Sequence, residues 1–128
     1  EVRVSNNLND VYDIKIIDDD KEYVESMSQN ILSSIPEEFS LGQNYPNPFN
    51  PVTKMDYSLP QSSKVVISIY NVLGQEIKTL VNQEQDYGYH SISWDGTDDS
   101  GMSVASGVYF TQMRSTGFSQ SKKMLLLK

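Results

Sequence analysis

The 128-residue chain has a formal net charge of −7, contains 38% hydrophobic and 10% aromatic residues, and has no cysteine. The absence of cysteine excludes disulfides, thiolate metal sites and cysteine nucleophiles, and the acidic balance argues against partners such as nucleic acid or an anionic membrane surface. The length suits one ordinary domain, and no apolar run approaches the ~20 residues of a membrane-spanning helix, so we expect no direct membrane insertion.

The negative charge is confined to the first third of the chain. Residues 1–39 hold ten acidic and three basic residues, whereas residues 40–128 hold seven of each. A charge step of this kind and the stretch "SSIPEEFS" predict a boundary near Ile35 to Ser40. We therefore predict an acidic N-terminal extension, or the tail of a preceding domain with a linker, over residues 1–35, and a domain over residues 36–128.

The extension contains one strand-like segment, Val11–Asp18, in which Tyr12, Ile14 and Ile16 share a face. The acidic run Asp18–Asp20 is typical of a turn. The segment that follows, up to Ile35, has apolar residues at helical spacing diluted by serines, so a short helix and a linker both fit.

A proline-rich stretch, "YPNPFNPVTKMDYSLP" (Tyr45–Pro60), precedes the regular strands. Proline fixes φ and pushes the residue before it toward extended conformations, which suits the entrance of a strand. We predict an entry clamp in which Tyr45 and Phe49 drop onto an open end of a sandwich. The alternative is a rigid linker with exposed aromatic side chains.

Alternating apolar residues recur from residue 52 to the last residue, with turn residues between the segments. This pattern predicts six or seven strands of an all-β antiparallel sandwich or barrel. Gly74 is expected to form a tight turn at positive φ. The residues expected to share one face within each segment are Met55, Tyr57 and Leu59; Val65, Ile67 and Ile69; Ile77, Thr79 and Val81; His90, Ile92 and Trp94; Tyr109, Thr111 and Met113; and Met124 and Leu126.

Catalytic chemistry has little support in the sequence. His90 is the single histidine, and no nucleophile motif accompanies it, so we expect no enzyme activity and no cofactor. One histidine without cysteine also argues against zinc.

Calcium is the remaining metal candidate. Asp95, Asp98 and Asp99 in "WDGTDDSG" offer oxygen ligands, but Ser100 and Ser106 stand where an EF-hand loop needs glycine and an acid. The same residues also suit a plain turn. Asp18–Asp20 carries the same two readings.

The segments "FSLGQNYPNPFNPVTKMDYSLP", "VVISIYNVLGQEIKTLV", "GYHSISWDGTDDSGMSVASGVYFTQM" and "SKKMLLLK" resemble the C-terminal sorting domain (type A) of bacterial type IX secretion cargo. They are also similar to the related immunoglobulin-like module of the flagellar hook-capping protein. The resemblance covers residues 36–128 in the family's order.

This resemblance implies an Ig-like β-sandwich of about seven strands at the end of a larger exported protein. It implies partners in the outer-membrane secretion machinery and a surface peptidase, attachment of the exported protein to the cell surface, and a location outside the cell or on its outer surface. The residues that match the family's "GVY" strand and its basic–apolar terminal strand are the export-signal candidates: Gly107, Val108, Tyr109, Lys122, Lys123, Met124, Leu125, Leu126, Leu127 and Lys128. From the residues alone, "MLLLK" also suits a packing strand without a recognition role.

A second hypothesis is a structural or adhesive module of a surface fibre. In that case the strand-like Val11–Asp18 would add to the sheet edge of a neighbouring copy, which predicts self-association through the N-terminal segment.

Overall fold

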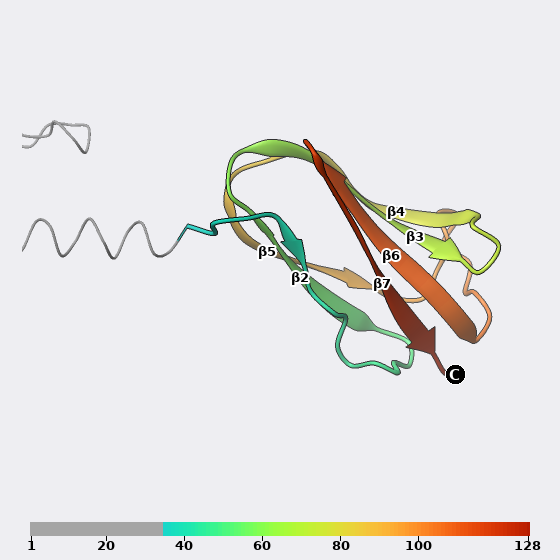
Figure 1. The fold of residues 1–128 in the computed structure, drawn as a ribbon. Coiled ribbons are helices and arrows are strands. Elements are labelled where there is room, and N and C mark those ends of the chain that lie inside the picture. Colours follow the sequence, from blue (N-terminus) through green and yellow to red (C-terminus); the bar gives the residue numbers. More distant parts are fainter. Residues whose placement is uncertain (1–34) are drawn as a thin grey trace, which may run out of the picture. The chain divides into compact units, whose positions relative to one another are not determined.

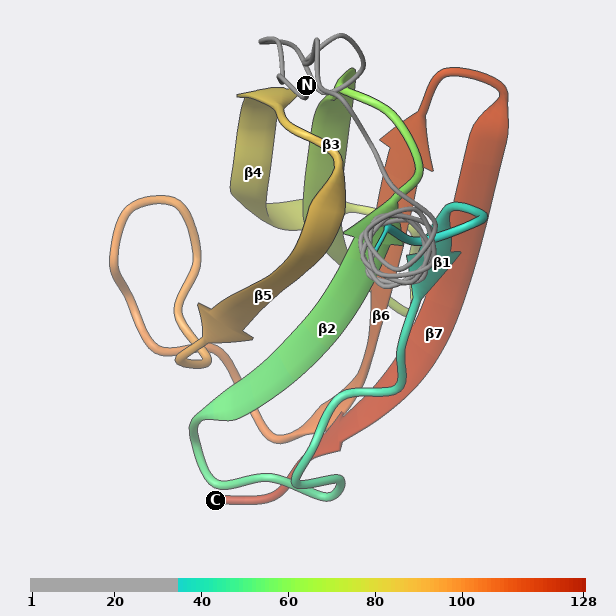
Figure 2. The same cartoon turned by 90° about the vertical axis from the view of Figure 1, so that its left-hand side faces the viewer.

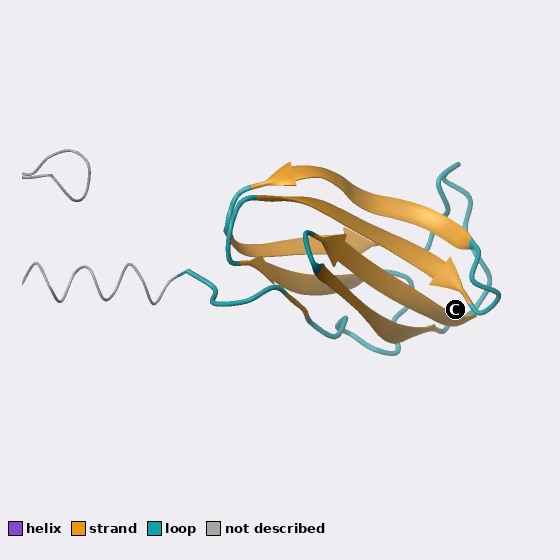
Figure 3. Ribbon diagram, turned by 45° about the horizontal axis from the view of Figure 1, so that its top comes forward, coloured by secondary structure: helices purple, strands orange, loops and turns teal. Residues whose placement is uncertain are grey.

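The computed structural model describes residues 35–128, which form seven strands and no helix (Figure 3). The strands are β1 (Ser40–Leu41), β2 (Thr53–Leu59), β3 (Ser63–Asn71), β4 (Glu76–Gln85), β5 (Gly88–Trp94), β6 (Gly107–Ser115) and β7 (Phe118–Leu126). Within these residues no helix is long and apolar enough to cross a bilayer. The predictions for residues 1–34, namely the strand, the acidic turn and the helix or linker, lie outside the described residues.

Two antiparallel sheets form the sandwich (Figure 1). One has three strands in the order β1-β2-β5, and the other has four in the order β4-β3-β6-β7. The predicted all-β, Ig-like antiparallel sandwich is therefore confirmed. The margins of the sheets are β1 and β7 on one side and β5 and β4 on the other (Figure 2).

The core lies between the sheets because side chains alternate across each strand. Met55, Tyr57 and Leu59 of β2 are buried, as are Val65, Ile67 and Ile69 of β3. The core has two adjoining clusters: Leu41, Tyr57, Leu59, Val65, Ile67, Val81 and Met113 in the first, and Phe49, Met55, Ile69, Trp94, Tyr109, Met124 and Leu126 in the second. The alternation predicted for β2, β3, β5, β6 and β7 is confirmed.

The prediction for β4 was wrong at one residue. The pairing of β3 with β4 shifts twice, so that Ile77 and Leu80 are extra residues without a partner in β3. Thr79 consequently pairs with Ser68, which lies on the face of β3 opposite Ile67 and Ile69 and is itself buried. Leu80 packs against both core clusters in place of Thr79. A β-bulge of this kind bends a strand and is not visible as a simple period-2 pattern.

The proline-rich segment leads the chain from β1 to β2, and we call residues 42–52 the leader. Phe49 lies in the core with 2% of its surface exposed, whereas Tyr45 stays 47% exposed and donates its hydroxyl to Asp56 at 3.1 Å. The entry-clamp prediction thus holds for Phe49 and was wrong for Tyr45. Asn44 fixes the bend because its buried amide donates to the Pro46 carbonyl and the Thr53 hydroxyl, at 3.1 and 2.9 Å.

Candidate functional site

The two segments that carry the export-signal candidates form one antiparallel ladder. Gly107, Val108 and Tyr109 of β6 pair with Leu126, Leu125 and Met124 of β7. A tight turn at Gly117, with φ of 68°, joins the two strands. In Figure 1, β6 and β7 lie side by side, with the start of β6 next to the end of β7 and the C-terminus. The fold therefore brings together residues that lie 15 to 19 positions apart in the sequence. Their role in export stays a prediction.

Half of this ladder points into the core. Tyr109, Met124 and Leu126 are buried, and the ring of Tyr109 meets Trp94 edge-on at 5.3 Å between centroids. The Tyr109 hydroxyl donates to the Ala105 carbonyl at 2.7 Å. Burial raises the pKa of Tyr109, since the ionised phenolate would lose its hydration there. These three side chains hold the two sheets together.

The other half of the ladder points away from the core. Val108, Lys123 and Leu125 alternate with the buried residues, and Val108 and Leu125 are half-buried. The Phe110 side chain lies in the next row, where Phe110 pairs with both Tyr70 and Lys123. Val72 continues this surface at the β3–β4 turn with 66% of its area exposed.

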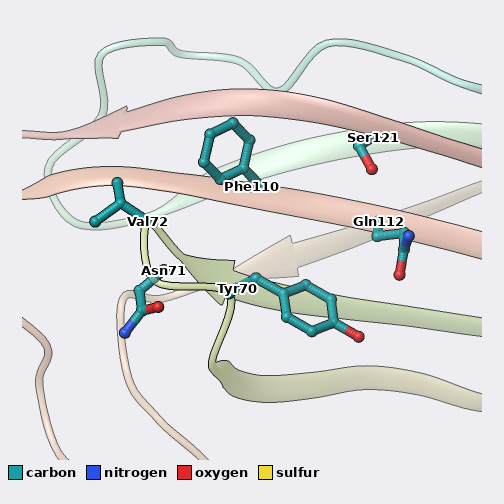
Figure 4. Close-up of a pocket in the computed structure, with 7 residues that line it drawn as sticks. Tyr70, Asn71, Val72, Phe110, Gln112 and Ser121 are labelled. Atoms are coloured by element: carbon teal, nitrogen blue, oxygen red, sulfur yellow. The ribbon is translucent and has the colours of Figure 1, made fainter.

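An open hollow lies on the outer face of the four-stranded sheet next to these residues (Figure 4). Tyr70, Val72, Phe110, Gln112 and Ser121 line it, with Asn71 and Gly74 at the turn. We call Tyr70, Val72, Val108, Phe110, Lys123 and Leu125 the outer patch. Tyr70, Val72 and Phe110 were not named as candidates from the sequence. They could have been found as large apolar residues on the faces of the strands opposite the core.

The outer edge of β7 is held by the leader. The amide of Gln43 donates to the Lys123 carbonyl at 2.8 Å, and the side-chain oxygen of Asn47 accepts the Leu125 N–H at 3.0 Å. Phe49 completes the contact as a parallel bridge: its N–H donates to Leu125, and its carbonyl accepts the N–H of Leu127, both at 3.0 Å. The end of β7 is therefore paired on both sides.

The C-terminal lysine lies against the loop before β6. The Lys128 N–H donates to the Ser106 hydroxyl at 3.0 Å, and its ammonium donates to the Ser103 hydroxyl at 2.5 Å. Lys122 and Leu127 stand at the margin of the sheet, with Leu127 49% exposed.

The three calcium candidates each bond to backbone or side-chain donors near them. Asp95 accepts the N–H and hydroxyl of Thr97, and Asp98 accepts the N–H and hydroxyl of Ser100 and the N–H of Met102. These bonds, led by the hydroxyl donors, lower the pKa of Asp95 and Asp98. Asp99 accepts the N–H of Thr79 at 3.2 Å and so guards the edge of β4.

No three His, Cys, Asp or Glu side chains gather as a metal site within residues 35–128. The loop geometry explains the aspartates as turn residues. Calcium binding at Asp95, Asp98 and Asp99 stays a prediction.

His90 lies on the core side of β5, where its ring stacks on Tyr57 at 5.2 Å. Its Nε2 atom is 2.8 Å from the Asp86 carbonyl oxygen. Among the described residues no hydroxyl bonds to the ring, so a nucleophile–base pair is not assembled there.

A family model described as the FlgD Ig-like domain matches residues 51–117. The comparison with curated proteins gave no match. Among solved structures, dimeric latent PorU from Porphyromonas gingivalis is similar over 66% of this chain, with a TM-score of 0.55 and 21% sequence identity. The matched part is 9% of the PorU chain, so the likeness concerns a small portion of that protein and supports the fold.

Two further structures show weaker likeness. FlgD from P. aeruginosa matches with a TM-score of 0.47 and 26% identity, over 58% of this chain and 59% of FlgD. PorZ, a surface component of the type IX secretion system of Porphyromonas gingivalis, matches with a TM-score of 0.49 and 17% identity, over 75% of this chain and 13% of PorZ.

Proposed function

This chain belongs to the FlgD Ig-like domain family, and from that premise we propose that it is a non-catalytic module for export. It directs a larger bacterial protein through the type IX secretion system to the outside of the cell or its outer surface. Its partners are the outer-membrane secretion machinery and a surface peptidase, and the module itself needs no cofactor.

The observation that carries this proposal is the ladder between the "GVY" and "KKMLLLK" segments. The sequence resemblance assigns the export signal to these two segments, and the fold pairs them residue by residue at one end of β6 and β7. A signal read from a folded module requires its residues to share one surface, and the outward half of the ladder meets that requirement.

The ladder also separates residues that hold the fold from residues that a partner can touch. Met124 and Leu126 are fully buried, so their removal would open the core. Lys123 and Leu125 lie on the outer patch together with Phe110. Deleting Lys122–Lys128 would therefore abolish folding and recognition together, and point substitutions are needed to test recognition alone.

The experiment compares outward substitutions within β7. Lys123→Glu and Leu125→Asn change the outer patch, and Ser119→Asn changes an exposed residue of the same strand and face at the far end of the ladder. Each variant is fused behind a reporter in a bacterium that has type IX secretion, and the reporter is measured in the periplasmic and surface fractions.

We expect the two outer-patch variants to lose at least tenfold in surface reporter, a factor that corresponds to about 1.4 kcal/mol of lost recognition. Ser119→Asn should be exported like the wild type. Normal export of both outer-patch variants, with urea unfolding that matches the wild type, would refute a signal on this surface.

A further inference from the structure

One sheet margin of the sandwich is unguarded, and it belongs to β5. Lys54 and Asp56 of β2 direct their backbone groups toward the leader and β1, because the Lys54 N–H and carbonyl bond to Tyr45 and the Asp56 carbonyl accepts the Gly42 N–H. The alternate residues of β2 must therefore bond to β5, where they lie opposite Gly88, His90, Ile92 and Trp94.

The backbone groups of Tyr89, Ser91 and Ser93 consequently point away from β2. No group in residues 35–128 bonds to them on that side. Figure 2 shows β5 along the margin of the three-stranded sheet, with β2 inside it. All three side chains are exposed, Tyr89 to 70%.

The other margins carry the devices that discourage pairing with a further strand. β1 has two residues, and β7 is covered at its end by the leader and carries two lysines. β4 contains two bulges, an exposed Glu84 and backbone bonds to Asp99. β5 is a regular strand of seven residues, "GYHSISW", without lysine, proline, charge or bulge.

The core is also incompletely covered between the edge strands β4 and β5. Ile77, Leu80 and Ile92 pack against the core clusters but stay partly exposed along the β4–β5 side. On the opposite side of the sandwich, Phe39 stacks on Phe118 at 5.4 Å and Phe49 fills the end. A strand added to β5 would cover apolar surface that the chain itself leaves open.

We propose that β5 pairs antiparallel with β5 of a second copy of this chain, about a twofold axis at Ser91. In this register Ser91 lies opposite Ser91 of the second copy, and Tyr89 lies opposite Ser93 of the second copy. Every outward N–H and carbonyl of the three residues then gains a partner, because such pairs exchange both hydrogen bonds. The two sheets join into one continuous sheet through an isologous contact.

Self-pairing fits the charges near this margin. A twofold axis brings each residue near its own copy, and the neutral Ser91 avoids the repulsion that a charged residue would create there. Asp86 and Asp95 flank β5, and the register places them opposite Gly96 and Tyr87 of the second copy rather than opposite each other. Residues 40–128 hold seven acidic and seven basic residues, so net charge in this part does not oppose association. This inference does not depend on the proposed export function.

A proline at residue 91 provides the test. The Ser91 N–H lies outside the ladder with β2, so Ser91→Pro removes one outward donor and leaves the sheet of the monomer intact. Ser91→Ala is the matched control, because it removes only the hydroxyl that donates to Asp56 at 2.9 Å. The full 128-residue wild type should sediment with twice the monomer mass at high micromolar concentration; Ser91→Ala should do the same, and Ser91→Pro should sediment as a monomer.

Cross-linking tests the register and also decides the question if Ser91→Pro unfolds. The chain has no cysteine, and opposed residues of such a pair have Cα atoms about 5.5 Å apart, within the range of a disulfide. Ser91→Cys should form a covalent dimer on mild oxidation at least tenfold faster than Ser119→Cys, which is exposed on β7. A wild type that stays monomeric would overturn the proposal, as would a folded Ser91→Pro variant that still dimerises or equal cross-linking of the two cysteine variants.

Discussion

Phe49 and Leu126 are neighbours in the fold, joined by a parallel bridge and buried in the same core cluster. Phe49 belongs to the leader and Leu126 belongs to β7, so the segment before β2 is held in place by the seventh strand. Three backbone or amide bonds around them, from Asn47 and Phe49 to Leu125 and Leu127, have lengths of 3.0 Å. The leader therefore supplies a core side chain and also directs the chain from β1 into β2.

Phe49→Ala tests this contribution. The ring is 2% exposed and its centroid lies 5.6 Å from that of the Trp94 ring, so its removal opens a cavity in the second core cluster. We expect the free energy of unfolding to fall by about 3–5 kcal/mol. Urea unfolding followed by Trp94 fluorescence measures the change. Tyr45→Ala, at an exposed aromatic of the same leader, should lower it by no more than about 1 kcal/mol, and equal losses would contradict the clamp.

Two buried threonines should respond to valine in opposite directions. The Thr111 hydroxyl is buried without a partner among the described residues, so Thr111→Val should stabilise the fold by about 1 kcal/mol. The Thr53 hydroxyl accepts from Asn44 and donates to the Pro46 carbonyl at 2.9 Å, so Thr53→Val should destabilise it by about 1–3 kcal/mol. Urea midpoints of both variants give the signs, and a loss of stability in Thr111→Val would show that its hydroxyl has a partner.

The turn at Asp98 should make the fold sensitive to acid. The Ser100 hydroxyl and the Met102 and Ser100 N–H groups lower the pKa of Asp98, so the folded protein binds this proton at lower pH than the unfolded chain. The stabilisation is complete above the ordinary aspartate pKa of about 3.9 and is lost as the pH falls through the lowered folded value. Urea midpoints between pH 2 and 6 should therefore fall less steeply in Asp98→Asn than in the wild type. If the urea midpoints of the two proteins fall equally with pH, Asp98 does not contribute to the loss of stability in acid.

Tyr57 should act at the opposite end of the pH range. Burial raises the pKa of Tyr57, partly offset by the hydrogen bond that its hydroxyl makes to Gln85 at 2.6 Å. Below the unfolded pKa of about 10 the group has no effect on the pH dependence, and stability falls as the pH rises toward the raised folded value. Tyr57→Phe should flatten the urea midpoints between pH 9 and 11. A slope as steep as that of the wild type would contradict a role for Tyr57 in the alkaline response.

The local alternation of side chains was enough to predict most of the sandwich. Val65, Ile67 and Ile69 were assigned to the core from their spacing alone, because a strand has only two faces. Leu80 could not be assigned in this way, since a bulge depends on how β4 meets β3 and not on β4 by itself. The exposed position of Tyr45 was missed for a similar reason: its hydroxyl bonds to Asp56, a contact that depends on the path of the leader.

The sequence predicted some residues of the candidate site, but it did not predict which residues lie next to one another. The resemblance selected Val108 and Leu125, and the register of β6 with β7 places them opposite each other. Tyr70 and Phe110 join them only because β3 lies beside β6, a neighbour relation that sequence spacing does not contain.

The parallel bridge at Phe49 has a consequence for biosynthesis. A ribosome produces Phe49 well before Leu125 and Leu127, so the N–H and carbonyl of Phe49 have no native hydrogen-bond partner until the end of β7 has been synthesised. Synthesis of β7 therefore supplies the hydrogen bonds that fix the leader, so the leader can take its final position only as one of the last steps of folding during translation.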